Sequence, residues 1–121
     1  MIPQLLRRLF ILHFVLDYIV AIPLMIAPQK VMMLLGWETP ESVATRLAAA
    51  ALIGIGGISL LAHNAGTETY RLMLTMKLLW SGAAITGLIL SIIEGAPVFA
   101  WVFLFIFAVF FCIWLFFRLK L

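Results

Sequence analysis

The stretch of the chain from residue 98 to residue 117 reads VFAWVFLFIFAVFFCIWLFF and contains no charged side chain. An α-helix needs about 20 residues to cross a hydrocarbon core about 30 Å thick, so this stretch has the length and composition of a membrane span. A strand of a transmembrane β-barrel would instead alternate apolar and polar residues. The stretch therefore predicts a transmembrane helix over residues 97–118.

The rest of the chain has the same character, because 66% of all 121 residues are hydrophobic and only 11% are charged. A soluble domain of this length needs more polar surface to cover its core. Three further apolar stretches predict helices over residues 5–27, 40–63 and 69–93. Four spans with short loops use the whole chain, so we expect an all-α fold. Its form would be an integral membrane four-helix bundle, a single transmembrane domain over residues 1–121.

The segment between the first two spans is too short to cross a membrane. Residues 28–35 predict a short interfacial helix that is closed by Gly36. The second span has a start signal in which Thr39 is the expected N-cap and Pro40 the first helical residue. Glu41 in its first turn would oppose the helix dipole. We therefore expect this segment to lie at the membrane surface between two spanning helices.

The Lys and Arg residues predict how the spans are oriented. Only Lys30 and Arg46 flank the spans on one side. The flanking residues on the other side are Arg7, Arg8, Arg71, Arg118 and Lys120. The side with more Lys and Arg is normally cytoplasmic, so we expect a multi-pass protein of the cell (inner) membrane with both termini in the cytoplasm. Scattered positive charge of this kind does not indicate a nucleic-acid partner.

Side-chain size predicts how the spans pack. Small residues at spacings of four, including Gly54 in the second span and Gly87 in the third, would let these helices approach closely. In the fourth span, Ala108 and Cys112 form a stripe of small residues that we expect to face the bundle. Most of its aromatic side chains would then face lipid or a partner.

Asp17 and Lys77 are the two acidic or basic residues that lie well inside spans. A charge at the centre of a membrane helix costs about 2.5–3.5 kcal/mol on insertion scales, so each one needs a partner or a function. The first and third spans run in the same direction, which places both residues in one half of the bilayer. His13 lies one turn from Asp17, and His63 ends the second span on the same side. These four residues predict either an ion pair that fixes helix register or a site for a ligand or a proton.

A second cluster is expected at the other membrane surface, where Arg46, Glu41 and Glu94 lie near the ends of spans. It can be a functional site, or it can consist of surface salt bridges and extended side chains that reach the headgroups. No metal site and no cofactor are expected. The single Cys112 excludes a multi-cysteine metal site, and two histidines without further signals do not indicate haem.

The stretch RLAAAALIGIGGIS, residues 46–59, precedes a helix that begins at Tyr70 and Arg71 and ends in EGAP, residues 94–97. This layout resembles the DoxX-like group of small four-helix prokaryotic membrane proteins. The resemblance covers the arrangement of most of the chain and implies a four-helix bundle of largely uncharacterised function. It carries over no catalytic motif.

Three classes of function remain open. The first is a non-enzymatic membrane protein that binds a small molecule, a lipid or a partner helix. The alternative is a small proton-coupled transporter, working as a homo-oligomer, in which Asp17 takes up and releases the proton. Small multidrug exporters have a similar size and an acidic residue in the first helix, which is an analogy of layout. A membrane enzyme comes third, because no nucleophile–base pair or metal-ligand spacing is visible.

Overall fold

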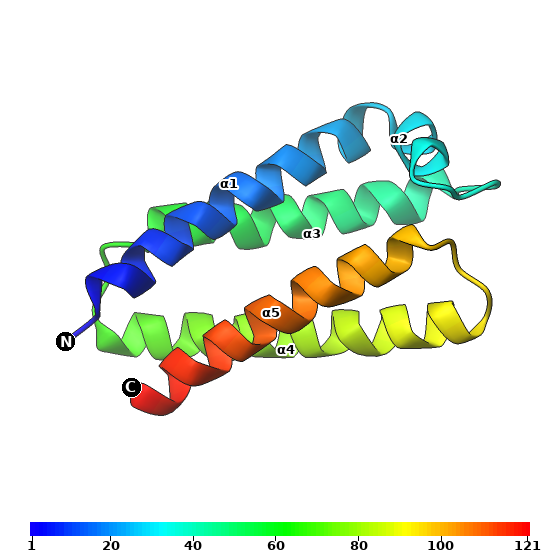
Figure 1. Cartoon of the computed structure of the whole chain (residues 1–121). Helices are drawn as coiled ribbons and strands as arrows, with labels where there is room; N and C mark the ends of the chain where they lie inside the picture. Colours follow the sequence, from blue (N-terminus) through cyan, green and yellow to red (C-terminus); the bar gives the residue numbers. More distant parts are fainter. The chain divides into compact units, whose positions relative to one another are not determined.

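The computed structural model describes every residue from Met1 to Leu121 and contains five α-helices and no strand. The helices are α1 (Gln4–Ile26), α2 (Pro28–Leu34), α3 (Ser42–Leu61), α4 (Thr67–Ile93) and α5 (Phe99–Lys120) (Figure 1). Four of them, α1, α3, α4 and α5, are long and apolar enough to cross a membrane. The predicted all-helical fold with four candidate spans is therefore confirmed, and each helix end lies within two residues of its predicted position.

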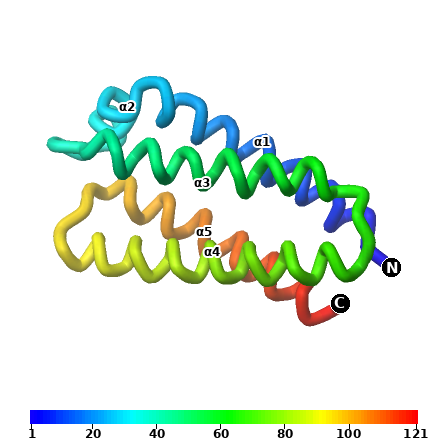
Figure 2. Tube along the Cα trace, turned by 180° about the vertical axis from the view of Figure 1, so that it is seen from behind, coloured from blue at the N-terminus to red at the C-terminus, as the bar shows by residue number.

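The chain forms two compact units, Met1–Gly66 with α1 to α3 and Thr67–Leu121 with α4 and α5. In the first unit, α1 and α3 lie side by side and run in opposite directions (Figures 1 and 2). In the second unit, α4 and α5 also form an antiparallel pair. The organisation is thus that of two helix hairpins, and a single domain over the whole chain stays a prediction.

Gly36 closes α2 as the sequence predicts. Its φ of 108° lies in the left-handed region, which glycine adopts without the steric cost of a Cβ. The Trp37 N–H donates to the Met32 carbonyl at 3.0 Å and the Gly36 N–H to the Met33 carbonyl at 3.0 Å. These two bonds form a Schellman motif, which satisfies carbonyls that have no partner inside the helix. Gly95, with φ of 96°, stands at the corresponding position after α4.

The beginning of α3 differs from the prediction, because Glu41 and not Thr39 is the N-cap and Pro40 precedes the helix. The Glu41 carboxylate accepts hydrogen bonds from the Val43 N–H at 3.1 Å and the Ala44 N–H at 2.6 Å. A carboxylate has two acceptor oxygens and a negative charge, so it can satisfy two free N–H groups that the single hydroxyl of a threonine could not both reach.

The α1–α3 pair is closely packed at Gly56 and Gly57. A Cβ placed on Gly56 would lie 2.9 Å from the Asp17 Cβ, and one on Gly57 would lie 3.0 Å from the Tyr18 hydroxyl oxygen. The Tyr18 hydroxyl donates a hydrogen bond to the Ile53 carbonyl at 3.0 Å. These small residues of α3 therefore make room for the side chains of α1.

The predicted close approach through Gly54 and Gly87 joins α3 and α4, which belong to different units, so it stays a prediction. Within its own unit neither residue lies in a close contact, because a Cβ placed on it would meet no atom within 4 Å. In α3 the contact with α1 falls on Gly56 instead, two residues further along and hence on a different face of the helix. The spacing of four therefore does not show which face of α3 packs against α1.

Arginines join α1 to α3 at both ends of the pair. At the first end, Arg7 Nη1 donates to the carbonyls of His63 at 2.7 Å and Ala65 at 3.0 Å. At the other end, Arg46 Nε donates to the Met25 carbonyl at 3.0 Å. The last carbonyls of a helix lack intrahelical partners and carry a partial negative charge, so a cation is favourable there. Each helix thus supplies an arginine near its start that caps the end of its antiparallel neighbour.

The second unit uses the same device. Arg71, in the second turn of α4, donates to the Leu121 carbonyl through two of its guanidinium nitrogens. Arg118 Nε near the end of α5 donates to Thr75 Oγ1 at 3.2 Å. Basic side chains therefore tie α4 to α5 at this end of the hairpin.

The packing face of α5 differs from the predicted stripe of Ala108 and Cys112. Cys112 is exposed, whereas Trp114 and Phe117 are buried. A Cβ placed on Gly82 of α4 would lie 3.6 Å from the Phe111 ring, an ordinary contact distance. Aromatic side chains therefore pack against α4. Most of the aromatic side chains of α5 were predicted to face outward, but only four of the ten are exposed, namely Phe99, Trp101, Phe105 and Phe116.

Candidate functional site

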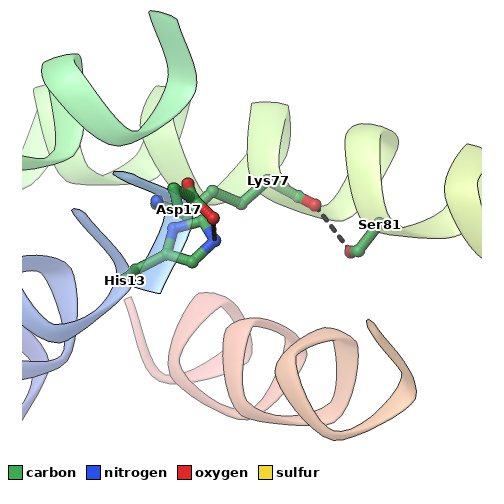
Figure 3. Close-up of polar contacts among 4 residues, drawn as sticks. All are labelled: His13, Asp17, Lys77 and Ser81. Atoms are coloured by element: carbon green, nitrogen blue, oxygen red, sulfur yellow. Dashed lines mark hydrogen bonds and ion pairs between the residues drawn. The ribbon is translucent and has the colours of Figure 1, made fainter. Parts of the chain in front are cut away.

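His13 and Asp17 form a buried pair inside α1. His13 Nε2 lies 3.3 Å from Asp17 Oδ1, and the two residues are only 5% and 7% exposed (Figure 3). Residues four positions apart are neighbours on one face of a helix, as the sequence indicates for this pair. This contact is a hydrogen bond when a protonated Nε2 donates to the carboxylate, or when a protonated Asp17 donates its O–H to an unprotonated Nε2. The pair is thus an imidazole–carboxylate dyad in a stretch of α1 that holds no other charged residue after Arg8.

This dyad faces the small residues of α3. Besides the contact at the Asp17 Cβ, a Cβ on Gly56 would lie 3.2 Å from Asp17 Oδ2, so the absence of a side chain there leaves room for the carboxylate. Ser59 follows Gly56 by three residues, which places the two on the same side of α3, and it is fully buried. Sequence reasoning did not select Ser59. Its spacing from Gly56 is the only signal that could have done so.

Lys77 is the buried cation of the second unit, with an exposed fraction of 0%. Its Nζ lies 4.9 Å from the centroid of the Trp114 ring, within the range of a cation–π interaction. Ser81 Oγ donates to the Lys77 backbone carbonyl at 2.6 Å (Figure 3). Lys77 and Asp17 belong to different units, so the predicted pairing of these two residues stays a prediction.

His63 lies just beyond the end of α3, where its Nδ1 is 2.6 Å from the Leu60 carbonyl. Its own carbonyl accepts the hydrogen bond from Arg7. Arg7 precedes His13 by six residues, so this end of the helix pair is about 9 Å along α1 from His13. His63 therefore takes part in the end of the hairpin, where its carbonyl anchors the first helix.

In the second predicted cluster, Arg46 and Glu41 bind backbone groups and do not form an ion pair with each other. Arg46 donates instead to the Met25 carbonyl, and the Glu41 carboxylate accepts from the first N–H groups of α3. Both charged side chains bind backbone groups nearby, and their charges also offset the partial charges at the ends of the helices. Glu94 is exposed and lies in the other unit, so its predicted place in this cluster stays a prediction.

The His13–Asp17 dyad can bind or release a proton, and its carboxylate can accept hydrogen bonds from a cationic or hydrogen-bonding ligand. No group of three or more His, Cys, Asp or Glu side chains in the structure is placed to hold a metal ion. No family model, curated protein or solved structure matches the chain. The chemistry of its buried side chains is therefore the guide to its function.

Proposed function

We propose that this protein spans the cell (inner) membrane and works by binding a small molecule, a lipid or a partner helix, and not by catalysis. The four long apolar helices would form a four-helix bundle, because helices satisfy all their backbone hydrogen bonds within hydrocarbon. Both termini would be cytoplasmic, on the side with more Lys and Arg. We also propose that the protein is related to the DoxX-like group of prokaryotic membrane proteins.

The observation that supports a binding function is the set of buried polar side chains in the α1–α3 pair, namely His13, Asp17 and Ser59. Ionisable groups inside the membrane are costly and rare, and those that occur there usually belong to functional sites. The Asp17 carboxylate provides acceptor oxygens, so the polar part of the ligand would be a cation or a hydrogen-bond donor.

The test is to purify the protein from membranes in mild detergent and to identify the small molecules and lipids that remain bound by mass spectrometry. Asp17→Asn keeps the shape of the side chain and removes its charge. Glu94→Gln is the matched control, because it removes an exposed carboxylate. We expect the wild type and the control to retain the same bound species. The affinity of Asp17→Asn for that species should be lower by about tenfold or more, because a charged hydrogen bond is lost. Equal retention by all three proteins would contradict the proposal.

A proton-coupled transporter is the second candidate, and the distance of 3.3 Å between His13 Nε2 and Asp17 Oδ1 favours it. An imidazole changes charge near neutral pH, and a neighbouring carboxylate makes the two protonation events interdependent. Asp17 would then take up and release the proton, with the protein working as an oligomer.

Transport is tested with the protein reconstituted in liposomes, a pH gradient across the bilayer and ethidium as the cationic probe. We expect Asp17→Asn to abolish gradient-driven movement of ethidium and His13→Gln to shift its pH profile. Glu94→Gln should behave as the wild type. Movement that does not depend on the pH gradient, or that survives in Asp17→Asn, would rule out this mechanism.

A further inference from the structure

The first unit has a cavity of about 370 Å³ between the end of α1, the first turn of α2 and the beginning of α3. This volume is near the lower end of the range of about 300–1,000 Å³ that is typical of ligand sites. Residues 26–28 form an apolar wall, and the polar residues of the lining are Gln29, Lys30, Ser42 and Arg46. The cavity is remote from the His13–Asp17 dyad, because its lining begins nine residues after Asp17, about 13 Å along α1.

The charge of this lining is entirely positive, since it contains Lys30 and Arg46 but no acidic residue. The acidic residue nearest to it in sequence, Glu41, directs its carboxylate to the backbone N–H groups of Val43 and Ala44. Two cations without an anionic partner attract a negatively charged ligand, and the attraction is stronger beside hydrocarbon than in bulk water. The cavity is therefore suited to an anion.

Arg46 is already held in place for this role. Its Nε donates to the Met25 carbonyl at 3.0 Å, which leaves the N–H groups of both terminal nitrogens for a ligand. A guanidinium held in this way presents a planar set of donors that matches the oxygens of a phosphate group. Lys30, Gln29 and Ser42 add an ammonium, an amide and a hydroxyl that make no side-chain hydrogen bond within the chain.

The position of the cavity indicates where the anion would come from. It lies where α1 and α3, two candidate membrane spans, meet the short helix α2, and an apolar wall adjoins its cations. A phospholipid with a net negative headgroup offers the same combination of a phosphate beside apolar chains. We propose that this cavity binds the phosphate of an anionic phospholipid headgroup, an inference that rests on the proposed location of the protein in a membrane.

The proposed orientation also predicts which leaflet of the membrane this cavity faces. The cavity is at the opposite end of α1 from Arg7 and the N-terminus. With a cytoplasmic N-terminus, it would face the outer leaflet of the membrane. The lipid would then be held against the end of α1, beside the loop that leads to α3.

Lys30→Gln is the decisive variant, because Lys30 is exposed and makes no hydrogen bond that its removal would break. Arg46→Gln is a second variant that also removes the bond to Met25. Arg8→Gln is the matched control, since Arg8 is an exposed cation at the other end of α1 without a hydrogen bond in the chain. Binding of phosphatidylglycerol and of zwitterionic phosphatidylcholine to the detergent-purified protein is titrated by native mass spectrometry.

We expect the wild type and Arg8→Gln to prefer phosphatidylglycerol over phosphatidylcholine. Lys30→Gln should weaken the binding of phosphatidylglycerol about tenfold, the effect of one lost charged hydrogen bond. An unchanged affinity in Lys30→Gln, or an equal loss in Arg8→Gln, would overturn the proposal.

Inorganic phosphate as a competitor separates the two sources of the anion. If phosphate at the concentration of the lipid displaces it, the ligand is a soluble anion and the assignment to a lipid is wrong. Asp17→Asn should leave the titration unchanged. An unchanged affinity of Lys30→Gln for phosphatidylglycerol would thus contradict the lipid site alone. Unchanged ligand retention by Asp17→Asn would contradict only the proposed site at Asp17.

Discussion

The Asp17 Cβ lies 2.9 Å from the position that a Cβ would occupy on Gly56. Carbon atoms of this kind do not approach so closely, and the Asp17 Cβ is fixed to its backbone and cannot move aside alone. A methyl group on Gly56 would therefore push α1 and α3 apart at the level of the buried dyad.

Gly56→Ala should consequently destabilise the protein by about 1–3 kcal/mol, the usual cost of overpacking. Gly54→Ala is the matched control in the same helix, because a Cβ there meets no atom within 4 Å. The control should be neutral or slightly stabilising, by up to about 1 kcal/mol, since alanine favours the helix more than glycine. Thermal unfolding in one detergent compares the two, and equal stabilities would contradict the packing at Gly56.

Replacement of Arg7 tests how the ends of the first hairpin are joined. Arg7→Gln removes charged hydrogen bonds to the carbonyls of His63 and Ala65, so we expect a loss of about 1.5–3 kcal/mol. Arg8→Gln removes the same charge from an exposed side chain next to it and should cost little. Unfolding of both variants by denaturant provides the comparison. If they lose the same stability, the effect is one of net charge and not of capping.

The N-cap of α3 predicts a dependence of stability on pH. Hydrogen bonds from the N–H groups of Ala44 and Val43 favour the charged carboxylate and lower the pKa of Glu41 below its usual value. A group whose pKa is lowered on folding stabilises the protein above its unfolded pKa, about 4.3 for Glu, and this contribution is lost as the pH falls through the folded pKa. The advantage of the wild type over Glu41→Ala should therefore be full at pH 7 and be lost progressively as the pH falls below the unfolded pKa and then through the lower folded pKa.

Thermal unfolding of both proteins across this range of pH measures that advantage. Glu38→Ala is the control, because Glu38 makes no hydrogen bond to the start of the helix. An advantage that stays constant down to the lowest pH would show that the ionised carboxylate is not the cap.

The orientation in the membrane is tested with reporters fused at the two ends of the chain and in the segment between α2 and α3. A reporter that is active only in the cytoplasm should work before Met1 and after Leu121, and one that needs the outer compartment should work between Gly36 and Pro40. Activity of the outer reporter after Leu121 would overturn the proposed orientation but not the number of candidate spans.

The features that the sequence predicted well are those with a local cause. Runs of apolar residues of sufficient length fix the spans, and Gly36 ends α2 because its conformation is open to glycine. The spacing of His13 and Asp17 placed both on one face, since the helical repeat leaves no other arrangement. In each case the information lies within a few residues of the feature.

The features that it missed depend on distant partners. Arg46 was expected in a cluster with Glu41 and Glu94, but its hydrogen-bond partner is the Met25 carbonyl. Every residue has a backbone carbonyl, so the sequence cannot indicate which one accepts such a bond. Gly54 and Gly56 are equally small, so only the packed structure shows which of them meets α1. The buried position of Trp114 was likewise hidden, because α5 is aromatic on all sides.

The two arginine bonds that fasten α1 to α3 differ in the length of chain that they close. The Arg46–Met25 bond spans 21 residues and the Arg7–His63 bond spans 56. Closing a shorter loop costs less conformational entropy, and both Met25 and Arg46 are synthesised before His63. The contacts between α1 and α3 would therefore form first at the end near α2 and then toward the N-terminus. Until the chain has grown past residue 65, the start of α1 would be free to change its depth in the bilayer.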